Sequence, residues 1–272
     1  MAEKNILLKA FNARWASLRK ELSRARRKQS EDVVHDLRVA SRRLIAVLET
    51  LREIQDGLAV QDFRRRVKKL LDGLSPLRDL HVQRMHVSKL AAQSPQLKGF
   101  EKSLADKENQ TAGKVKRILK HSPKLGRAMT QSSRHARKAV DRRAILKVID
   151  KRFRKVLLLA GRIEPSDTST IHQMRLAFKK FRYTCEVAQP IIRKEMDDAR
   201  LEQFHAFQTM MGDIQDIEVL SGRLSRWTEK RKCKAEMEPV FKELEVEKKK
   251  RIDTFVRSAE QVHTLWNPGA RK

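Results

Sequence analysis

Apolar residues recur with helical spacing along most of the chain, and residues 34–44, which read VHDLRVASRRL, show the pattern clearly. On an α-helix, positions spaced i, i+4, i+7, i+11 and i+14 share one face. Small or apolar side chains fill those positions here, namely Leu37, Ser41, Leu44, Leu48 and Leu51. A second face, roughly 130° away, carries His35, Arg38 and Arg42. Taken alone, such a charged stripe is usually the solvated side of a helix.

The same spacing predicts helices over nearly the whole sequence. They cover about 3–28, 31–56, 59–74, 76–92, 97–120, 142–162, 168–189, 196–211, 213–231 and 236–264. The 272 residues include nine Gly and seven Pro, and β-branched residues form no long alternating run, so an all-α fold is expected. Ser75 before Pro76 is typical of a helix N-terminus, and Asp213 is placed to cap a later helix. Alternatively, the segments on either side of each form one bent helix.

The pattern of the first half returns 137 residues later. Residues 171–183 read IHQMRLAFKKFRY and repeat the histidine, the cations and the apolar face of residues 34–44. The segment LSPLRDLHV at 74–82 keeps the same offset from MGDIQDIEV at 211–219. A register held over so much of the chain indicates an internal duplication.

The duplication predicts how the chain is organised. We expect one domain over 1–272, made of repeat 1 (1–120) and repeat 2 (142–272) joined by a linker at 121–141, which contains Pro, Gly and Ser. Each repeat is expected to form an antiparallel helical bundle. Two similar bundles tend to pack with pseudo-two-fold symmetry, and the two charged stripes would then face one shared groove.

The charge of the chain is extreme. Lys and Arg number 62 against 34 Asp and Glu, so the formal net charge is +28, while 40% of the residues are hydrophobic, enough for a folded core. Such a field attracts polyanions, whether nucleic acid, anionic membrane or polyphosphate. No stretch approaches the roughly 20 apolar residues of a membrane span, no signal peptide is visible, and Cys185 and Cys233 lack metal or redox spacing. A cytoplasmic protein is expected.

The duplication changes the interpretation of the stripe. Cations aligned at i, i+3 and i+7 repel one another, and a solvated surface has no reason to keep them in both copies. Arginine presents a planar fork to phosphate oxygens, lysine a point charge, and histidine a donor that strengthens on protonation. From His35 to Arg42 the helix rises about 10 Å. A chain of phosphates fits that length better than a single phosphate does.

The motifs resemble those of a known family. The pattern H-x-L-R-x-x-x-R-R-L, the later H-x-x-R-x-x-x-K-K-x-R-Y, and the paired L-R-D-L and G-D-I-Q-D-I segments are similar to the CHAD domain, the conserved-histidine α-helical domain. The resemblance implies a duplicated helical-bundle fold around a basic central channel that binds inorganic polyphosphate. The residues that would line the channel are His35, Arg38, Arg42, Arg43, His172, Arg175, Lys179, Lys180 and Arg182. Ile45 stands where the family often has another arginine, which predicts that the first repeat binds the polyphosphate less tightly than the second.

Other polar residues favour binding over catalysis. Asp79 and Asp216 each stand alone, as expected for a helix cap or a partner of a channel arginine rather than for a catalytic acid. The stretch EVEKK at 245–249 matches a metalloenzyme signature that works from a β-strand, whereas here it lies in a helical pattern. We expect no catalytic residues, no metal site and no cofactor, since the chain has no Gly-rich phosphate loop and no metal-binding motif.

The sequence therefore predicts a binding protein rather than an enzyme. Its expected ligand is inorganic polyphosphate, held as a linear polyanion in a basic channel between two helical bundles. Association with polyphosphate granules is expected as well. The alternative is nonspecific binding of nucleic acid, which rests on the same net charge. A polyphosphate hydrolase would need a metal site that the sequence does not show.

Overall fold

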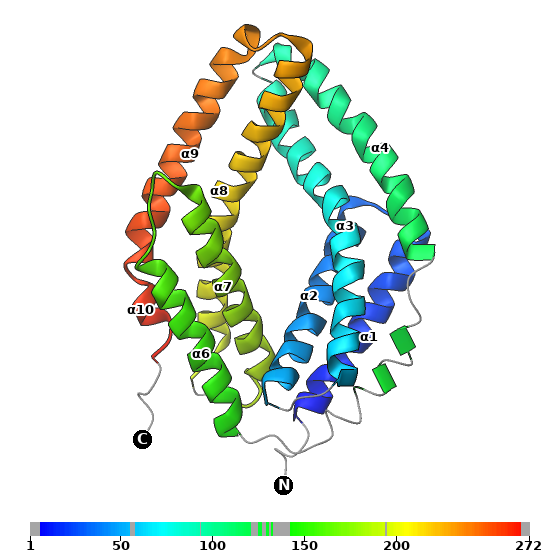
Figure 1. The fold of residues 1–272 in the computed structure, drawn as a ribbon, viewed down its shortest axis with the longest axis vertical. Coiled ribbons are helices and arrows are strands. Elements are labelled where there is room, and N and C mark those ends of the chain that lie inside the picture. The colour runs from blue at the N-terminus through cyan, green and yellow to red at the C-terminus, as the bar shows by residue number, and fades with distance from the viewer. Residues whose placement is uncertain are drawn as a thin grey trace. The chain divides into compact units, whose positions relative to one another are not determined.

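The computed structural model describes residues 6–54, 58–92, 94–120, 125–126, 129–130, 132, 142–193 and 195–267 (Figure 1). Secondary structure in these residues is helical throughout, which confirms the all-α prediction. The elements are α1 (Ile6–Arg27), α2 (Glu31–Ile54), α3 (Leu58–Ala91), η2 (Pro95–Leu97), α4 (Lys98–Lys120), α6 (Arg142–Ala160), α7 (Thr168–Ala188), α8 (Asp198–Arg231), η3 (Ala235–Met237), α9 (Glu238–Ala259) and α10 (Val262–Leu265). Most of the predicted linker at 121–141 lies outside the described residues.

The order of elements in the first half recurs in the second. In each half, two helices lead to a long helix, a short 3₁₀ turn and a further helix. The helices α2 and α7 begin at Glu31 and Thr168, which is the offset found in the sequence, and α3 and α8 each contain 34 residues. This order agrees with an internal duplication, while the packing of the repeats as two tandem bundles stays a prediction.

The long helices α3 and α8 decide between the two interpretations of Ser75 and Asp213. Pro76 lies inside α3, and Asp213 lies inside α8. The prediction that Ser75 and Asp213 cap helices is therefore wrong, and one long helix forms in each half. An interior proline removes one backbone hydrogen bond and crowds the preceding turn. The buried leucines Leu74 and Leu77 on either side of Pro76 supply packing that offsets this cost.

The chain divides into two compact units that combine distant stretches of sequence. Unit 1 comprises Met1–Arg78, Gln110–Arg152 and Lys180–Leu201. Unit 2 comprises Asp79–Asn109, Phe153–Lys179 and Glu202–Lys272. Each unit contains residues from both halves of the chain, so the units are not the sequence repeats. The division into repeats 1–120 and 142–272 stays a prediction about the sequence.

The core of unit 1 forms where α1 packs against α2. The predicted core face of α2 is fully buried, with 0% exposure at Leu37, Ser41, Leu44, Leu48 and Leu51. From α1, Phe11 and Trp15 set their rings edge-on against Phe63 of α3, with centroids 6.1 and 5.5 Å apart. Phe11 and Phe63 are fully buried, while Trp15 is half-buried. This face fixes which side of α2 turns to the core, and so where its charged stripe lies.

The core of unit 2 is formed by α3, α4, α8 and α9. Leu80, Phe100, Leu220 and Leu244, one from each helix, belong to a single buried cluster. The predicted core residue Phe153 is fully buried as well. Aromatic rings extend the packing toward α7, since Phe178 contacts Phe204, Phe207 packs on Phe178, and Phe255 packs on Phe207. The apolar side of α7 is thereby held in place.

Candidate functional site

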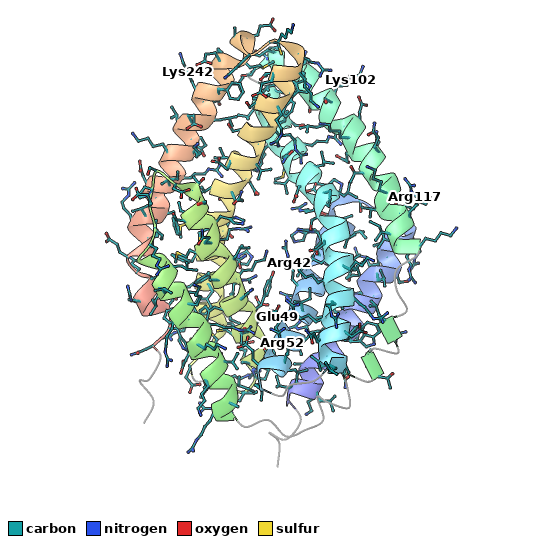
Figure 2. All side chains as sticks on the ribbon, in the orientation of Figure 1. Arg42, Glu49, Arg52, Lys102, Arg117 and Lys242 are labelled. Atoms are coloured by element: carbon teal, nitrogen blue, oxygen red, sulfur yellow. The ribbon has the colours of Figure 1, made fainter. Side chains whose placement is uncertain are left out.

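The first charged stripe lies along α2 and belongs to unit 1. Glu31 and Asp32 in the first turn favour the positive end of the helix dipole. Along the stripe His35 is exposed, Arg38 is buried, and Arg42 and Arg43 are half-buried. Figure 2 shows Arg42, Glu49 and Arg52 following one another along the same helix. Because Arg38 is buried and Arg42 and Arg43 are half-buried, protein covers part of the stripe, and it is not a fully solvated helix face.

Arg38 is anchored at the proline in α3. Its side chain is 6% exposed, and Nη1 donates to Ser75 Oγ at 2.5 Å and to the Leu71 carbonyl at 3.5 Å. Ser75 Oγ in turn donates to the same carbonyl at 3.0 Å. The turn preceding Pro76 thus supplies acceptors for a buried guanidinium. These contacts fix the position of Arg38 in the stripe.

His35 is surrounded by positive charge. It reaches solvent, yet the protein around the ring withholds enough water to lower its pKa below the ordinary value of 6.5. The charge of Arg78 lowers the pKa further and Asp36 opposes the shift, while Arg42 and Arg38 also lower it. The imidazole is therefore neutral at pH 7 in the absence of a ligand. An anion beside it would reverse part of this shift.

Arg43 and Arg182 meet at one carboxylate in unit 1. Arg43 Nε lies 3.3 Å from Glu186 Oε2, and Arg182 Nη1 lies 2.5 Å from Glu186 Oε1. Arg182 is buried, and its guanidinium carbon stands 4.5 Å from the centroid of the Tyr183 ring. Tyr183 is itself buried, so it packs on a cation of the predicted site. The geometry brings these two predicted arginines together.

The second stripe begins on α7 in unit 2. His172, Arg175 and Lys179 are all half-buried. Nδ1 of His172 is buried and makes no hydrogen bond within the described part of the chain. Arg175 lies against Gly212 of α8, since a Cβ on that glycine would stand 3.6 Å from Arg175 Nη2. Gly212 occupies the place that Ser75 has in the first half, so each copy sets an arginine against the middle of its long helix.

The predicted site residues thus fall into two groups. Unit 2 contains His172, Arg175 and Lys179. Unit 1 contains His35, Arg38, Arg42, Arg43, Lys180 and Arg182. Each group is assembled by the fold of its own unit, and a channel lined by both groups stays a prediction.

Asp79 and Asp216 lie within helices, and the predicted capping role is wrong for both. Burial raises the pKa of the Asp216 carboxyl, while the charges of His86 and Arg175 lower it. Asp216 therefore lies within electrostatic reach of the predicted channel residue Arg175, while an ion pair between the two stays a prediction. Asp79 is exposed, and its charge raises the pKa of Arg223 against the effect of burial.

Comparison with known protein families gives one match. The CHAD domain matches residues 9–225, which is most of the chain. The chain belongs to the CHAD family. This family is linked in general to polyphosphate binding.

Solved structures support the CHAD fold. The crystal structure of the CHAD domain from the plant Ricinus communis superposes with a TM-score of 0.74 at 16% identity, covering 95% of this chain and 92% of that one. PptA from Streptomyces chartreusis superposes with a TM-score of 0.71 at 13% identity, covering 96% of this chain and 99% of that one. A search of curated proteins finds no match. At these identities the structures show a shared fold.

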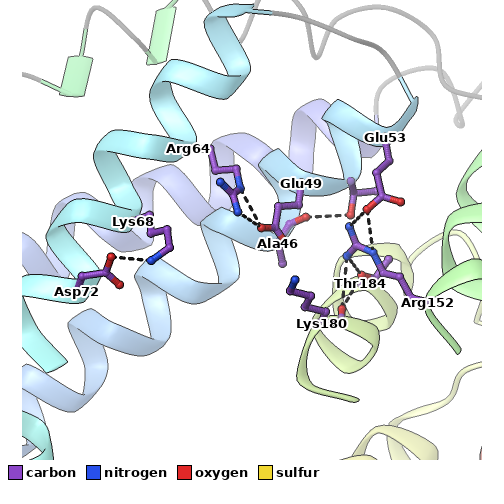
Figure 3. A network of polar contacts seen from close by, with 10 residues as sticks. Ala46, Glu49, Glu53, Arg64, Lys68, Asp72, Arg152, Lys180 and Thr184 are labelled. Carbon is purple, nitrogen blue, oxygen red and sulfur yellow. Dashed lines mark hydrogen bonds and ion pairs between the residues drawn. The ribbon is translucent and has the colours of Figure 1, made fainter. Parts of the chain in front are cut away.

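The structure of this chain shows polar residues near the predicted site that the sequence did not indicate. Arg152 of α6 is buried and donates to Glu53 of α2 at 2.6 Å, and also to the Thr184 hydroxyl and, at 3.4 Å, the Lys180 carbonyl (Figure 3). Lys180 itself is exposed. Glu186 and Arg78 were likewise missed as neighbours of the stripe. For Glu186 one signal was available, since it lies four residues after Arg182, the spacing of a helical ion pair.

Unit 2 of the CHAD chain also contains a cavity of about 520 Å³ between α3, α8 and α9. Leu90, Ile217 and Leu220 form apolar parts of its lining, and Lys89 and Lys242 are among its charged residues. No predicted stripe residue lines it. Within the described residues there is no cluster of three or more His, Cys, Asp or Glu suited to a metal ion. None of the described helices is both long and apolar enough to cross a membrane.

Proposed function

We propose that this CHAD protein binds inorganic polyphosphate through its two charged stripes, in a basic channel lined by both. The observation that carries the proposal is the partial burial of a His and cation pattern that occurs twice, on α2 and on α7. Placing like charges side by side and partly out of water is unfavourable unless an anion accompanies them. The family's general link to polyphosphate supports the choice of anion.

The geometry of α2 favours a linear ligand. Arg38 is fixed at the long helix α3, whereas Arg42 and Arg43 stand one turn further along the stripe. Successive turns of a helix lie about 5.4 Å apart. Cations on successive turns can contact separate phosphate groups of one chain, so affinity is expected to grow with chain length.

The test is a salt titration of binding to long-chain polyphosphate. In the double variant Arg42→Gln/Lys179→Gln, affinity should fall at least about tenfold, and the salt dependence should weaken because fewer counterions are released. The control is Lys102→Gln/Arg117→Gln, which removes the same two residue types from exposed positions on α4 (Figure 2). Equal losses in both variants would mean that net charge, and not the stripe, determines binding.

Nucleic acid is the competing ligand, because a net charge of +28 attracts any polyanion. A competition experiment separates the two ligands. At equal phosphate concentration and matched salt, polyphosphate should displace duplex DNA. Displacement in the opposite direction would favour the nucleic-acid function.

We also propose that the protein binds polyphosphate without cleaving it, in the cytoplasm and at polyphosphate granules. Incubation with polyphosphate and Mg²⁺ or Mn²⁺ should release no orthophosphate above the level of a heat-inactivated control. Release that is lost in Asp216→Asn would instead identify a hydrolase. The same protein carrying a fluorescent label should concentrate on granules in cells that accumulate polyphosphate.

A further inference from the structure

The single carboxylate of Glu186 joins two arginines of the proposed binding site. Arg43 reaches it from α2 at 3.3 Å, and Arg182 reaches it from α7 at 2.5 Å. The Glu186 side chain is 12% exposed, so water screens these contacts only in part. The carboxylate therefore occupies the place between two guanidinium groups where a phosphate would bind.

A third arginine lies in the same surroundings. Arg14 is half-buried on α1, which packs against α2. Burial lowers the pKa of Arg14, the charge of Arg43 lowers it further, and the charge of Glu186 raises it. Arg14 is thus within electrostatic reach of both residues. Arg43 and Arg182 contact Glu186, and Arg14 adds a third positive charge in the same surroundings.

Glu49, a half-buried carboxylate of unit 1, pairs with its arginine differently. Glu49 accepts from Arg64 through two nitrogens, at 2.8 and 2.6 Å, so its arginine is held by a paired contact (Figure 3). At Glu186 the contact with Arg43 is single and longer. A phosphate group offers more oxygens and more charge than a carboxylate, and arginine binds both in the same fork geometry. The Glu186 cluster is therefore better suited than the Glu49 pair to exchange its carboxylate for phosphate.

We propose that Arg43 and Arg182 form one phosphate-binding centre, and that Glu186 occupies it in the absence of ligand. A phosphate group of the polyanion displaces Glu186 from Arg43, and the charge of Arg14 helps to attract it. The inference rests on the proposed polyphosphate function and adds two elements to it. Arg14 contributes positive charge to ligand binding, and Glu186 becomes an internal competitor that weakens binding and releases the polymer more readily.

The first test is the variant Glu186→Gln, which removes the competing charge and keeps the shape of the side chain. Its affinity for long-chain polyphosphate should rise about three- to tenfold over wild type. The matched control is Glu49→Gln, because Glu49 is also 12% exposed and also pairs with an arginine, so the change in net charge is identical. A gain in Glu186→Gln no larger than that in Glu49→Gln would overturn the inference.

A second pair of variants keeps the test decisive if Glu186→Gln fails to fold. Arg14→Gln should lower affinity severalfold, whereas Arg19→Gln, an exposed arginine of the same helix, should have little effect. Equal affinities of these two variants would also overturn the inference. Failure of the underlying function would look different, since wild type itself would then not bind polyphosphate in the same titration.

Discussion

His35 shows how a single side chain links the proposed ligand to pH. In the free protein its pKa lies below 6.5, because of desolvation and the charge of Arg78, with smaller effects of the same sign from Arg42 and Arg38. Asp36 acts in the opposite direction. A bound polyanion would add negative charge and raise this pKa. Binding and protonation of His35 therefore favour each other.

We predict that polyphosphate affinity rises as the pH falls from about 7 through the ordinary histidine range near 6.5. The gain is complete once the pH lies below the lowered pKa of the free protein, and it is absent above the raised pKa of the complex. Titrations at several pH values should show this rise in wild type, and His35→Gln should reduce it. His205→Gln, at an exposed site on α8, should leave the rise in place. A pH dependence in His35→Gln as steep as that of wild type would contradict the prediction.

A second prediction concerns the anchor of Arg38. Ser75→Ala should lower the free energy of unfolding by about 1 kcal/mol, because a buried guanidinium loses an acceptor. Ser258 serves as the control, since its hydroxyl bonds to the carbonyl four residues back at 3.0 Å, as that of Ser75 does. Urea unfolding should show a clearly smaller loss for Ser258→Ala. Equal losses would mean that Arg38 gains nothing from Ser75.

These residues also show what sequence can and cannot predict about the site. The helical period correctly put His35 and Arg42 on a face away from the buried leucines of α2. It could not separate the buried Arg38 from the half-buried Arg42, because burial depends on where α3 lies. The helical period also could not predict the contact between Arg43 and Glu186, because these two residues are 143 positions apart in sequence.

At the scale of helices, a buried ion pair joins α2 to α6. The Arg152 side chain is 8% exposed and pairs with Glu53, which is 24% exposed. Arg152 also bonds to Thr184 and to the backbone of α7. The charges of such a network add little net stability, and its main effect is to fix how the helices pack. Its carboxylate is nonetheless needed, since without it a buried guanidinium would lack a countercharge.

We predict that Glu53→Gln lowers the free energy of unfolding by about 1–3 kcal/mol, measured with urea. Asp62→Asn is the control, because Asp62 and Arg66 form an ion pair of 2.7 Å at the surface of α3. Exposed pairs contribute little, so the control should change stability by less than about 0.5 kcal/mol. Similar effects in the two variants would show that burial of the Arg152 pair has no energetic weight.

Most helices could be predicted from the sequence, and the exceptions have a common cause. The expected segments 31–56 and 168–189 match α2 and α7 closely, because each has a continuous apolar face and polar residues at its ends. The prediction for Ser75 and Pro76 was wrong because the same dipeptide can begin a helix or lie inside one. Which of these forms depends on packing with the rest of unit 1, and the local sequence does not specify that packing.

For the whole molecule, the excess of positive charge dominates. With +28 net charges in 272 residues, the folded chain repels itself, and a bound polyanion would relieve that repulsion. Neutralisation acts together with the specific contacts of the stripes. The free energy of unfolding in the presence of ligand therefore reports on the relief of charge repulsion together with the specific contacts.

We predict that long-chain polyphosphate at about 100 times its Kd stabilises the fold by about 2.7 kcal/mol. For a chain of this size that corresponds to a rise in Tm of roughly 5–10 °C. Orthophosphate at the same total phosphate concentration should produce a much smaller rise, since it cannot span several cations. Equal shifts from the two ligands would argue against a site built for a chain.

The make-up of unit 1 also bears on synthesis of the protein. This unit needs segments that end at Arg78, at Arg152 and at Leu201, and unit 2 needs segments up to the last helices. A ribosome must therefore deliver about three quarters of these 272 residues before unit 1 has all its parts, and nearly all of them before unit 2 does. Until then the earliest helices expose leucine faces that have no permanent cover. Newly made chains should accordingly depend on chaperones for longer than a protein whose domains are completed one after another.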